Sequence, residues 1–177
     1  EINRLEEFSI NNLQYYDEDV LLLSNAIKNC SSLKKCHIGF NYWDRSGEKN
    51  KIVDKFNTMY FHSDSKLTEL NFKNCQLSEN SVKHLMKQLE LNKSVKHANF
   101  INCGLNDRSC IYLANTLKEN THLKDLLLDN NKIRDEGIIV LSSFLKHNST
   151  LRNFSINENY MRDSFIIFIG NLVKKQD

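Results

Sequence analysis

The stretch that decides the fold is LTELNFKNCQL at residues 67–77. Similar stretches follow at intervals of 28 residues: VKHANFINCGL at 95–105, LKDLLLDNNKI at 123–133 and LRNFSINENYM at 151–161. Self-similarity at a fixed period of this size indicates stacked structural repeats, and it outweighs the interpretation of any single element. The sequence therefore predicts a solenoid, in which each repeat buries its apolar side against the next.

The repeat extends over nearly all of the 177 residues. Working outward from the four clear copies, we distinguish units that begin at Leu5, Leu33, Leu67, Val95, Leu123 and Leu151. The second unit is longer than the others, and its extra residues fall near 44–51. No linker or change of composition separates the units, so we expect a single domain over residues 1–177. Because the chain begins at Glu1 rather than methionine, we expect this domain to be part of a longer protein.

Each unit divides into a strand and a helix. If the first residue of a unit is position 1, positions 3 to 7 alternate, with apolar residues such as Leu70 and Phe72 at positions 4 and 6. This alternation predicts a short strand that turns those two side chains inward. In the second half of the unit, Val82, Leu85 and Leu89 recur with helical spacing and form one apolar stripe. The sequence therefore predicts an α/β fold with parallel strands on one side and helices on the other.

Two polar positions also recur from unit to unit. Position 13 is acidic in most units, where a carboxylate is expected to cap the backbone amides at the start of a helix: Asp17, Glu79, Asp107, Asp135 and Asp163. Position 9 is a small polar residue, except for Leu13 in the first unit: Asn41, Cys75, Cys103, Asn131 and Asn159. Stacked units would align these side chains into a ladder that satisfies the backbone groups of the turns. Both recurrences indicate structure rather than catalysis.

The pattern LxxLxLxxC/N-x-L followed by an amphipathic helix resembles the leucine-rich repeat family. The period of 28 residues is similar to that of the ribonuclease-inhibitor-like subclass, and the likeness covers the chain from Leu5 to about Val173. The resemblance implies a right-handed, curved solenoid of about six repeats, with parallel strands on the concave side and helices on the convex side. It is specific for a fold and does not identify a function.

The side chains at positions 3, 5 and 7 are expected to point away from the core. They combine charges, amides and a few apolar groups, which suits a polar protein partner. We therefore predict a partner-binding surface on the concave face, made of Lys35, His37, Glu69, Asn71, His97, Asn99, Ile101, Asp125, Leu127 and Asp129. Position 2 is basic in four units, which favours either an acidic partner or ordinary solvated side chains: Lys34, Lys96, Lys124 and Arg152.

Composition and motifs argue against most other functions. The net charge of +2 gives no general case for nucleic acid, and no apolar run approaches the roughly 20 residues that cross a bilayer. The five cysteines and six histidines show no metal-ligand spacing, and the five glycines form no phosphate-binding loop. We expect no metal, no cofactor, no small-molecule substrate and no membrane insertion. Unpaired cysteines favour a reducing, cytoplasmic location.

The sequence therefore predicts a non-enzymatic module or scaffold subunit that binds other proteins, with a cytoskeletal or ciliary assembly as the specific expectation. An alternative follows from the resemblance, because one branch of the family activates the GTPase Ran through strand-to-helix loops. Arginines lie in the corresponding loops: Arg45, Arg108, Arg134 and Arg162. A simpler interpretation of these arginines is exposed pairing with the acids at position 13.

Two further interpretations stay open at this stage. An enzyme inhibitor like the ribonuclease inhibitor is less favoured, because those inhibitors carry more repeats and a strongly acidic face. The extension near residues 44–51 is either a tolerated surface insertion or part of a binding face. Trp43, just before it, is expected to fill a core leucine position rather than to anchor a partner.

Overall fold

The computed structural model describes residues 4–11, 17–39 and 61–162, together with residues 166, 168 and 170. Within these residues the secondary-structure elements, in chain order, are β1 Glu7–Asn11, α1 Asp17–Asn29, β2 Lys35–Gly39, β3 Glu69–Asn71, α3 Glu79–Leu91, β4 His97–Asn99, α4 Asp107–Glu119, β5 Asp125–Leu127, α5 Asp135–Leu145 and β6 Asn153–Ser155. Several sequence predictions lie outside the described residues, namely those for Leu13, Asn41, Trp43, Arg45, the extension near 44–51 and Asp163.

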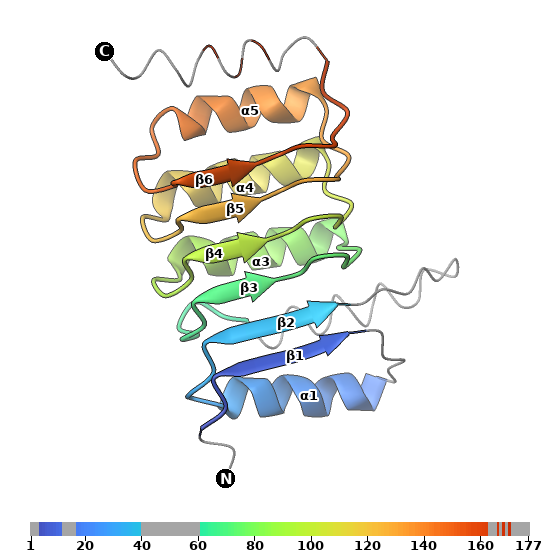
Figure 1. The fold of residues 1–177 in the computed structure, drawn as a ribbon, viewed down its shortest axis with the longest axis vertical. Helices are drawn as coiled ribbons and strands as arrows, with labels where there is room; N and C mark the ends of the chain where they lie inside the picture. Colours follow the sequence, from blue (N-terminus) through green and yellow to red (C-terminus); the bar gives the residue numbers. More distant parts are fainter. Residues whose placement is uncertain are drawn as a thin grey trace.

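The strands form one parallel six-stranded sheet in the order β1-β2-β3-β4-β5-β6 (Figure 1). Equivalent positions of successive units face each other, so that Lys35 pairs with Glu69 and Glu69 pairs with His97. The predicted α/β class is confirmed, and the register follows the repeat that the sequence shows. In Figure 1 the helices α3 and α4 lie behind the sheet, and its other face carries no helix of the described residues.

The strands β3 to β6 are shorter than predicted, because each ends at position 5 of its unit rather than at position 7. Backbone bonds between units continue beyond the strands, since the Phe72 amide donates to the Asn99 carbonyl at 2.8 Å. The chain then turns through a residue with positive φ, namely Asn74, Asn102, Asn130 or Glu158. Asparagine tolerates this left-handed conformation better than most residues, which explains why it recurs there.

The core lies between the sheet and the helices. The residues predicted to point inward are buried in the third to fifth units, and the rings of Phe72 and Phe100 stack with centroids 5.6 Å apart. The helical stripe of Val82, Leu85 and Leu89 is buried as predicted. Burying each such side chain stabilises the fold by about 1.5–3 kcal/mol, so the sheet-to-helix layer is the main source of stability.

The helix starts differ from the prediction in one respect. The acids at position 13 are the first helical residues, and the residue before them is the cap. Ser78 accepts a hydrogen bond from the Ser81 amide, and Asn106 forms a capping box with Ser109. Their short side chains reach the amides of their own helix, which frees the acids for other contacts.

The last unit also departs from the predicted stripe. Ile166, which we expected to be buried, is 76% exposed, whereas Phe168 is 3% exposed and its ring lies 6.0 Å from that of Phe154. The equivalent of Ile166 in the preceding unit is Ile138, which is fully buried. The stripe therefore works as predicted only where the described chain supplies a unit on both sides.

Candidate interaction surface

The predicted binding residues come together on the face of the sheet that lies opposite the helices. The strands place them in two rows, which we call the open face: Lys35, Glu69, His97 and Asp125 in the first row, and His37, Asn71, Asn99 and Leu127 in the second. Each strand buries its middle residue and leaves the flanking two exposed or half-buried. Ile101 and Asp129 lie just beyond the ends of β4 and β5, in the turns.

Side chains on the open face interact across neighbouring strands. An oxygen of Asp125 contacts Nδ1 of His97, and its other oxygen accepts a hydrogen bond of 2.5 Å from the Asn153 amide. The Nε2 atom of His37 lies 3.2 Å from the Glu69 carboxylate, although the two are not aligned as a hydrogen bond. Such pairs between partly exposed groups add little stability, but they fix where the charges lie.

Other predicted residues hold the turns together. The side-chain oxygens of Asn71 and Asn99 accept hydrogen bonds from the amides two residues later, at 3.1 and 3.0 Å. Asp129 accepts hydrogen bonds from the Asn157 amide and the Ser155 hydroxyl, at 2.6 and 2.5 Å. Asp129 therefore has a structural role. Among the predicted set, the apolar residue within a strand of the open face is Leu127, which is half-buried.

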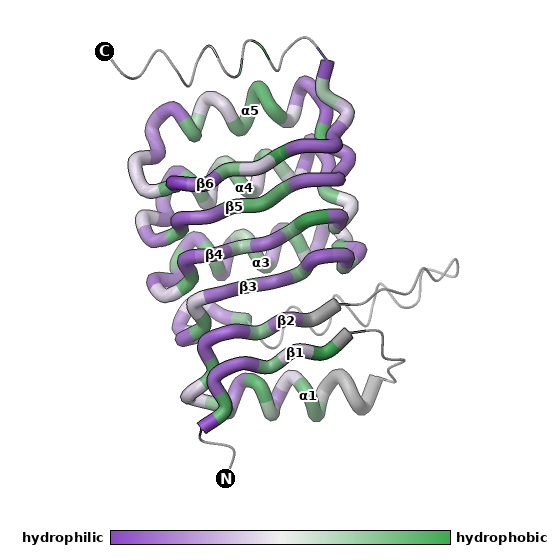
Figure 2. Tube along the Cα trace, in the orientation of Figure 1, coloured by the Kyte–Doolittle hydropathy of each residue, from purple (hydrophilic) through white to green (hydrophobic). Residues whose placement is uncertain are grey.

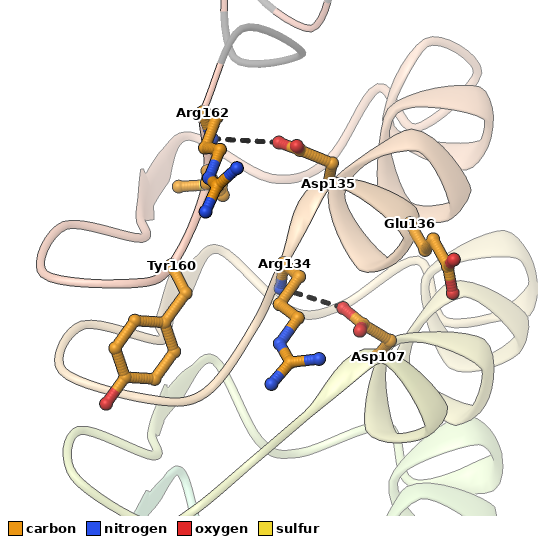
Figure 3. A pocket seen from close by; sticks show the side chains of 7 residues that line it. Asp107, Arg134, Asp135, Glu136, Tyr160 and Arg162 are labelled. Atoms are coloured by element: carbon orange, nitrogen blue, oxygen red, sulfur yellow. Dashed lines mark hydrogen bonds between the residues drawn. The ribbon is translucent and has the colours of Figure 1, made fainter.

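The strand-to-helix turns of the fifth and sixth units border an open hollow of about 720 Å³ (Figure 3). Asp107 accepts hydrogen bonds from the amides of Arg134 and Gly137, at 2.8 and 3.0 Å, and Asp135 accepts one from the amide of Arg162 at 2.9 Å. The acids thus tie one unit to the next through the backbone, a role that the sequence prediction missed.

The arginines of these turns behave in two ways. Arg108 forms an ion pair with Glu79 at 3.1 Å, in agreement with the simpler interpretation of exposed pairing. The side chains of Arg134 and Arg162 extend into the hollow instead (Figure 3), and within the described residues neither forms an ion pair. Only these two of the four candidate arginines share one site, because Arg108 lies elsewhere and Arg45 is outside the described residues.

The predicted ladder at position 9 is present in the described units. Asn131 is 4% exposed, and its oxygen accepts hydrogen bonds from the amides of Cys103 and Leu105, at 2.9 and 3.0 Å. Its nitrogen donates to the carbonyls of Phe100 and Leu128, at 2.9 and 2.8 Å. One side chain therefore satisfies backbone groups of two units, as a buried polar residue requires.

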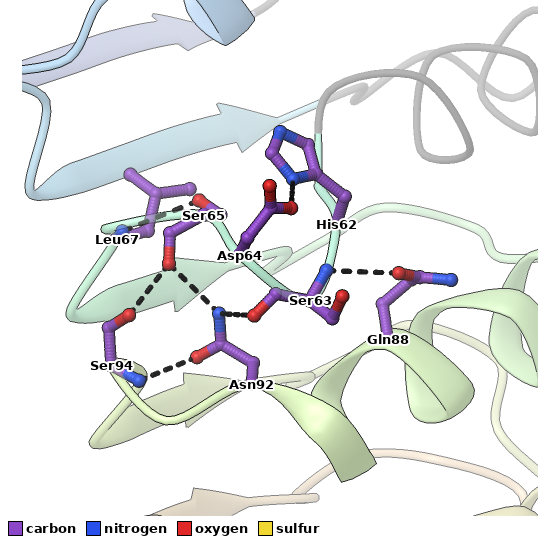
Figure 4. A network of polar contacts seen from close by, with 8 residues as sticks. All are labelled: His62, Ser63, Asp64, Ser65, Leu67, Gln88, Asn92 and Ser94. Carbon is purple, nitrogen blue, oxygen red and sulfur yellow. Dashed lines mark hydrogen bonds and ion pairs between the residues drawn. The ribbon is translucent and has the colours of Figure 1, made fainter.

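A second ladder, which the sequence prediction missed, lies at the helix-to-strand turns. It consists of asparagines three residues before the start of a unit: Asn92, Asn120 and Asn148. The oxygen of Asn92 accepts hydrogen bonds from the amides of Ser94 and Val95, and its nitrogen donates to the carbonyls of Ser63 and Ser65 (Figure 4). The signal was available, because these asparagines are also spaced by 28 residues.

The second ladder is interrupted towards the start of the chain. The residue equivalent to Asn92 in the preceding unit is Asp64, which contacts His62 instead of bridging two units (Figure 4). The hydrogen bond from His62 is the main cause that lowers the pKa of Asp64. A small pocket of about 190 Å³ lies beside this interruption, lined in part by Cys30, His62 and Asp64.

The cysteines are thiols in the described residues, and four of them are buried. Burial raises the pKa of Cys36 and Cys110 to about 12, and it raises the pKa of Cys103 well above its ordinary value. A reactive cysteine needs the opposite shift, so these thiols are built for packing. The described residues contain no cluster of His, Cys, Asp and Glu suited to a metal ion. They also contain no helix that has both the length and the apolar character to cross a membrane.

No known protein-family model matches the chain, and no curated protein matches it in sequence. Among solved structures, the chain is similar to one described as Leiomodin-1 Actin-Binding Site 2 (ABS2), with a TM-score of 0.53 and 19% sequence identity. The match covers 77% of this chain and 92% of that chain. At this identity the likeness concerns the fold alone. It is compatible with a leucine-rich-repeat-like α/β fold.

Proposed function

We propose that the chain is a curved, right-handed leucine-rich repeat domain of the ribonuclease-inhibitor-like subclass, which binds another protein without catalysing a reaction. The observation that carries the proposal is the open face. Its eight side chains lie in two rows across four adjacent strands, and the opposite face of the same strands is buried. The proposed role is that of a scaffold subunit in a cytoskeletal assembly.

Rigidity supports this role. The backbone of each unit is bonded to the next by strand hydrogen bonds and by both asparagine ladders, which include Asn131 and Asn120. A surface that is ordered before it binds loses less conformational entropy on association. The mixture of amides, opposite charges and one half-buried leucine, Leu127, suits a polar protein surface better than an apolar ligand.

Actin is the first partner to test, because the description of the structural neighbour assigns actin binding to that protein. We expect the chain to sediment with actin filaments, or else to capture another partner from a cytoskeletal extract. In either case, Leu127→Arg on β5 and Lys35→Glu on β2 should each weaken binding by about tenfold or more, because each places an unmatched charge within the interface.

The matched control is Lys83→Glu, an exposed position on α3. It changes the net charge as Lys35→Glu does, and it lies on a helix rather than on the open face. Circular dichroism of all three variants checks that the fold is intact. Binding that is weakened equally by the helix variant, or that is insensitive to both open-face variants, contradicts the proposal.

A second candidate function is stimulation of a Ran-type GTPase, and it is favoured by one observation. Arg134 and Arg162 extend from adjacent turns into one hollow, and neither forms an ion pair with a described residue. An arginine supplied to a bound nucleotide stabilises the charge that develops during phosphoryl transfer. Single-turnover GTP hydrolysis by Ran, measured with the intact chain and with Arg134→Ala and Arg162→Ala, tests this alternative. An unchanged rate with the intact chain rules it out.

A further inference from the structure

A row of basic side chains runs along the edge of the sheet where the strands begin. Lys96, Lys124 and Arg152 occupy position 2 in three consecutive units, and their backbones are bonded in series. The Lys124 amide donates to the Lys96 carbonyl at 2.8 Å, and the Arg152 amide donates to the Lys124 carbonyl at 2.7 Å. We call these three residues the basic row. They lie outside the eight residues of the open face.

The surroundings of the basic row are also basic. The helix-to-strand turns, which run from the ladder residue to position 2, contain the cations Lys34, Lys66, Lys93, Lys96, Lys124 and Arg152. In the same five turns the acid is Asp64, which contacts His62. In Figure 2 the beginnings of β3 to β6 are correspondingly hydrophilic. The net charge of +2 conceals this edge, because the acids of the chain lie elsewhere.

The fold uses the backbone of the basic row but not its charges. No carboxylate among the described residues forms an ion pair with any of the three side chains, and Lys96 and Arg152 are exposed. The nearest acid in sequence, Asp125, is engaged with His97 and Asn153. The first two units differ, because Lys34 at the same position is paired with Glu6 at 2.5 Å. The free row therefore begins at the fourth unit.

The spacing of the row selects the form of its partner. Neighbouring strands lie about 4.8 Å apart, and one turn of an α-helix rises about 5.4 Å. Over the two steps of the row the mismatch is about 1.2 Å, which long side chains absorb. An extended peptide repeats the same face only every 6.6–6.8 Å or so, which accumulates a mismatch of about 4 Å. No Phe, Tyr or Trp occurs in these turns, so they offer no stacking platform for a single-stranded nucleic acid.

We infer that the basic row binds an acidic α-helix of a partner protein, with one carboxylate per helical turn opposite Lys96, Lys124 and Arg152. Three like charges at this spacing repel one another, and a matching line of carboxylates relieves that repulsion. The row is separate from the open face, so this inference does not depend on the function proposed above. Charged contacts of this kind act mainly on the association rate and on the choice of partner.

The experiment uses the intact chain and a labelled, alanine-rich helical peptide of about 20 residues, long enough to be helical in water. In the probe peptide, glutamates form one stripe at i, i+4, i+7, i+11 and i+14. Its isomer has the same composition, with the glutamates spread around the helix. Fluorescence anisotropy at low salt should show that the stripe peptide binds about tenfold more tightly than the isomer. Equal affinity for the two peptides overturns the inference.

Variants of the chain locate the binding site. Charge reversal at Lys96, Lys124 and Arg152 together should abolish binding of the stripe peptide. If that variant does not fold, the change of the same three residues to glutamine should weaken binding by about tenfold. The control reverses three exposed cations elsewhere, namely Lys73, Lys83 and Lys132, with the same change in net charge. An equal loss in the control shows a general charge effect and overturns the inference.

Two further arms separate other anionic partners from a helix. Duplex DNA and vesicles that contain phosphatidylserine present phosphate or carboxylate groups without a helical stripe. Tighter binding of either one than of the stripe peptide overturns the commitment to an acidic helix. Leu127→Arg should leave the discrimination between the two peptides intact, so failure of the open-face proposal and failure of this inference are distinguishable.

Discussion

The two sets of turns in this molecule are built on the same principle but differ in what they leave over. At both, a buried polar side chain such as Asn131 or Asn120 bonds to backbone groups of two units. At the strand-to-helix turns, the acids Asp107, Asp129 and Asp135 are also engaged with the backbone of the next unit. At the helix-to-strand turns, the cations of the basic row take no part in the fold.

The difference separates two meanings of a recurring charge. A charge whose side chain accepts hydrogen bonds from the next unit recurs because the stack requires it. A charge whose side chain has no described partner recurs for another reason, and solubility or binding are the physical options. The strand-to-helix turns illustrate the first meaning, and the basic row illustrates the second.

The largest effect is expected from Asn120→Ala at the helix-to-strand turn. Asn120 is 2% exposed, donates to the carbonyls of Leu89 and Asn92, and accepts from the amides of His122 and Leu123. Removing its amide leaves buried backbone groups unpaired, which should lower the free energy of unfolding by about 3 kcal/mol. Urea unfolding measures the change.

The control for this comparison is Asn115→Ala, an exposed asparagine of the same helix α4. It should change the free energy of unfolding by less than about 0.5 kcal/mol. A similar cost for the two variants means that the second ladder does not stabilise the stack.

A smaller effect, confined to the strand-to-helix side, is expected at high pH. Burial raises the pKa of Cys103 well above its ordinary value of 9.0, whereas the amides of the other ladder do not titrate. Above pH 9 the unfolded chain releases this proton and the folded chain retains it, so stability is lost as pH rises. The loss for one thiol is about 1.4 kcal/mol per pH unit. Urea unfolding at pH 8 and pH 10, under reducing conditions, measures it.

The variant for this prediction is Cys103→Ala, which lacks the thiol. It should be less stable than the wild type at pH 8, but its stability should fall less steeply towards pH 10. Because lysines and tyrosines titrate in the same range in both proteins, the difference between the two slopes isolates the thiol. Identical slopes contradict the prediction.

A still smaller effect, of opposite sign, is expected from Glu158→Asn. Glu158 has φ of 54° at a position where the other units have asparagine. Asparagine tolerates this conformation better, so the substitution should stabilise the protein by about 0.5–1 kcal/mol. Thermal unfolding measures the shift, and Asn130→Ala, at the equivalent turn with φ of 56°, should give a shift of opposite sign.

The smallest effect is expected from neutralising the basic row. Lys96→Gln, Lys124→Gln and Arg152→Gln should each change the free energy of unfolding by less than about 0.5 kcal/mol, because none of these side chains has a described ion-pair partner. A destabilisation above 1 kcal/mol would show that the fold uses these charges. The contrast between the two sets of turns would then disappear.

Much of the fold was predictable because spacing carries it. The period of 28 residues specified the strand positions, the inward residues such as Phe72 and Phe100, and the ladder that contains Asn131. The register of the open face follows from the same period, which places His97 opposite Asp125. The second ladder was missed although its spacing was visible, because attention to apolar periodicity left isolated asparagines unread.

Other features depend on side-chain direction, which spacing does not specify. Asp107 was expected to cap its own helix, but its carboxylate reaches the amide of Arg134 in the next unit, and Asn106 is the cap. The burial of Ile138 and the exposure of Ile166 are likewise opposite outcomes of one sequence pattern, because burial depends on the neighbouring unit. Whether the open face binds a partner is not tested by the geometry.

The pairing of each strand only with the next in sequence has a consequence for how such a chain forms and changes. Paired residues are separated by 28 residues, or by 34 between Lys35 and Glu69, so no pairing closes a longer loop. The search for partners stays local, which favours rapid assembly for a parallel sheet. Gain or loss of a whole unit by gene duplication or deletion presents every remaining strand with an equivalent neighbour. The length of the molecule can therefore evolve in steps of one unit without any new kind of contact.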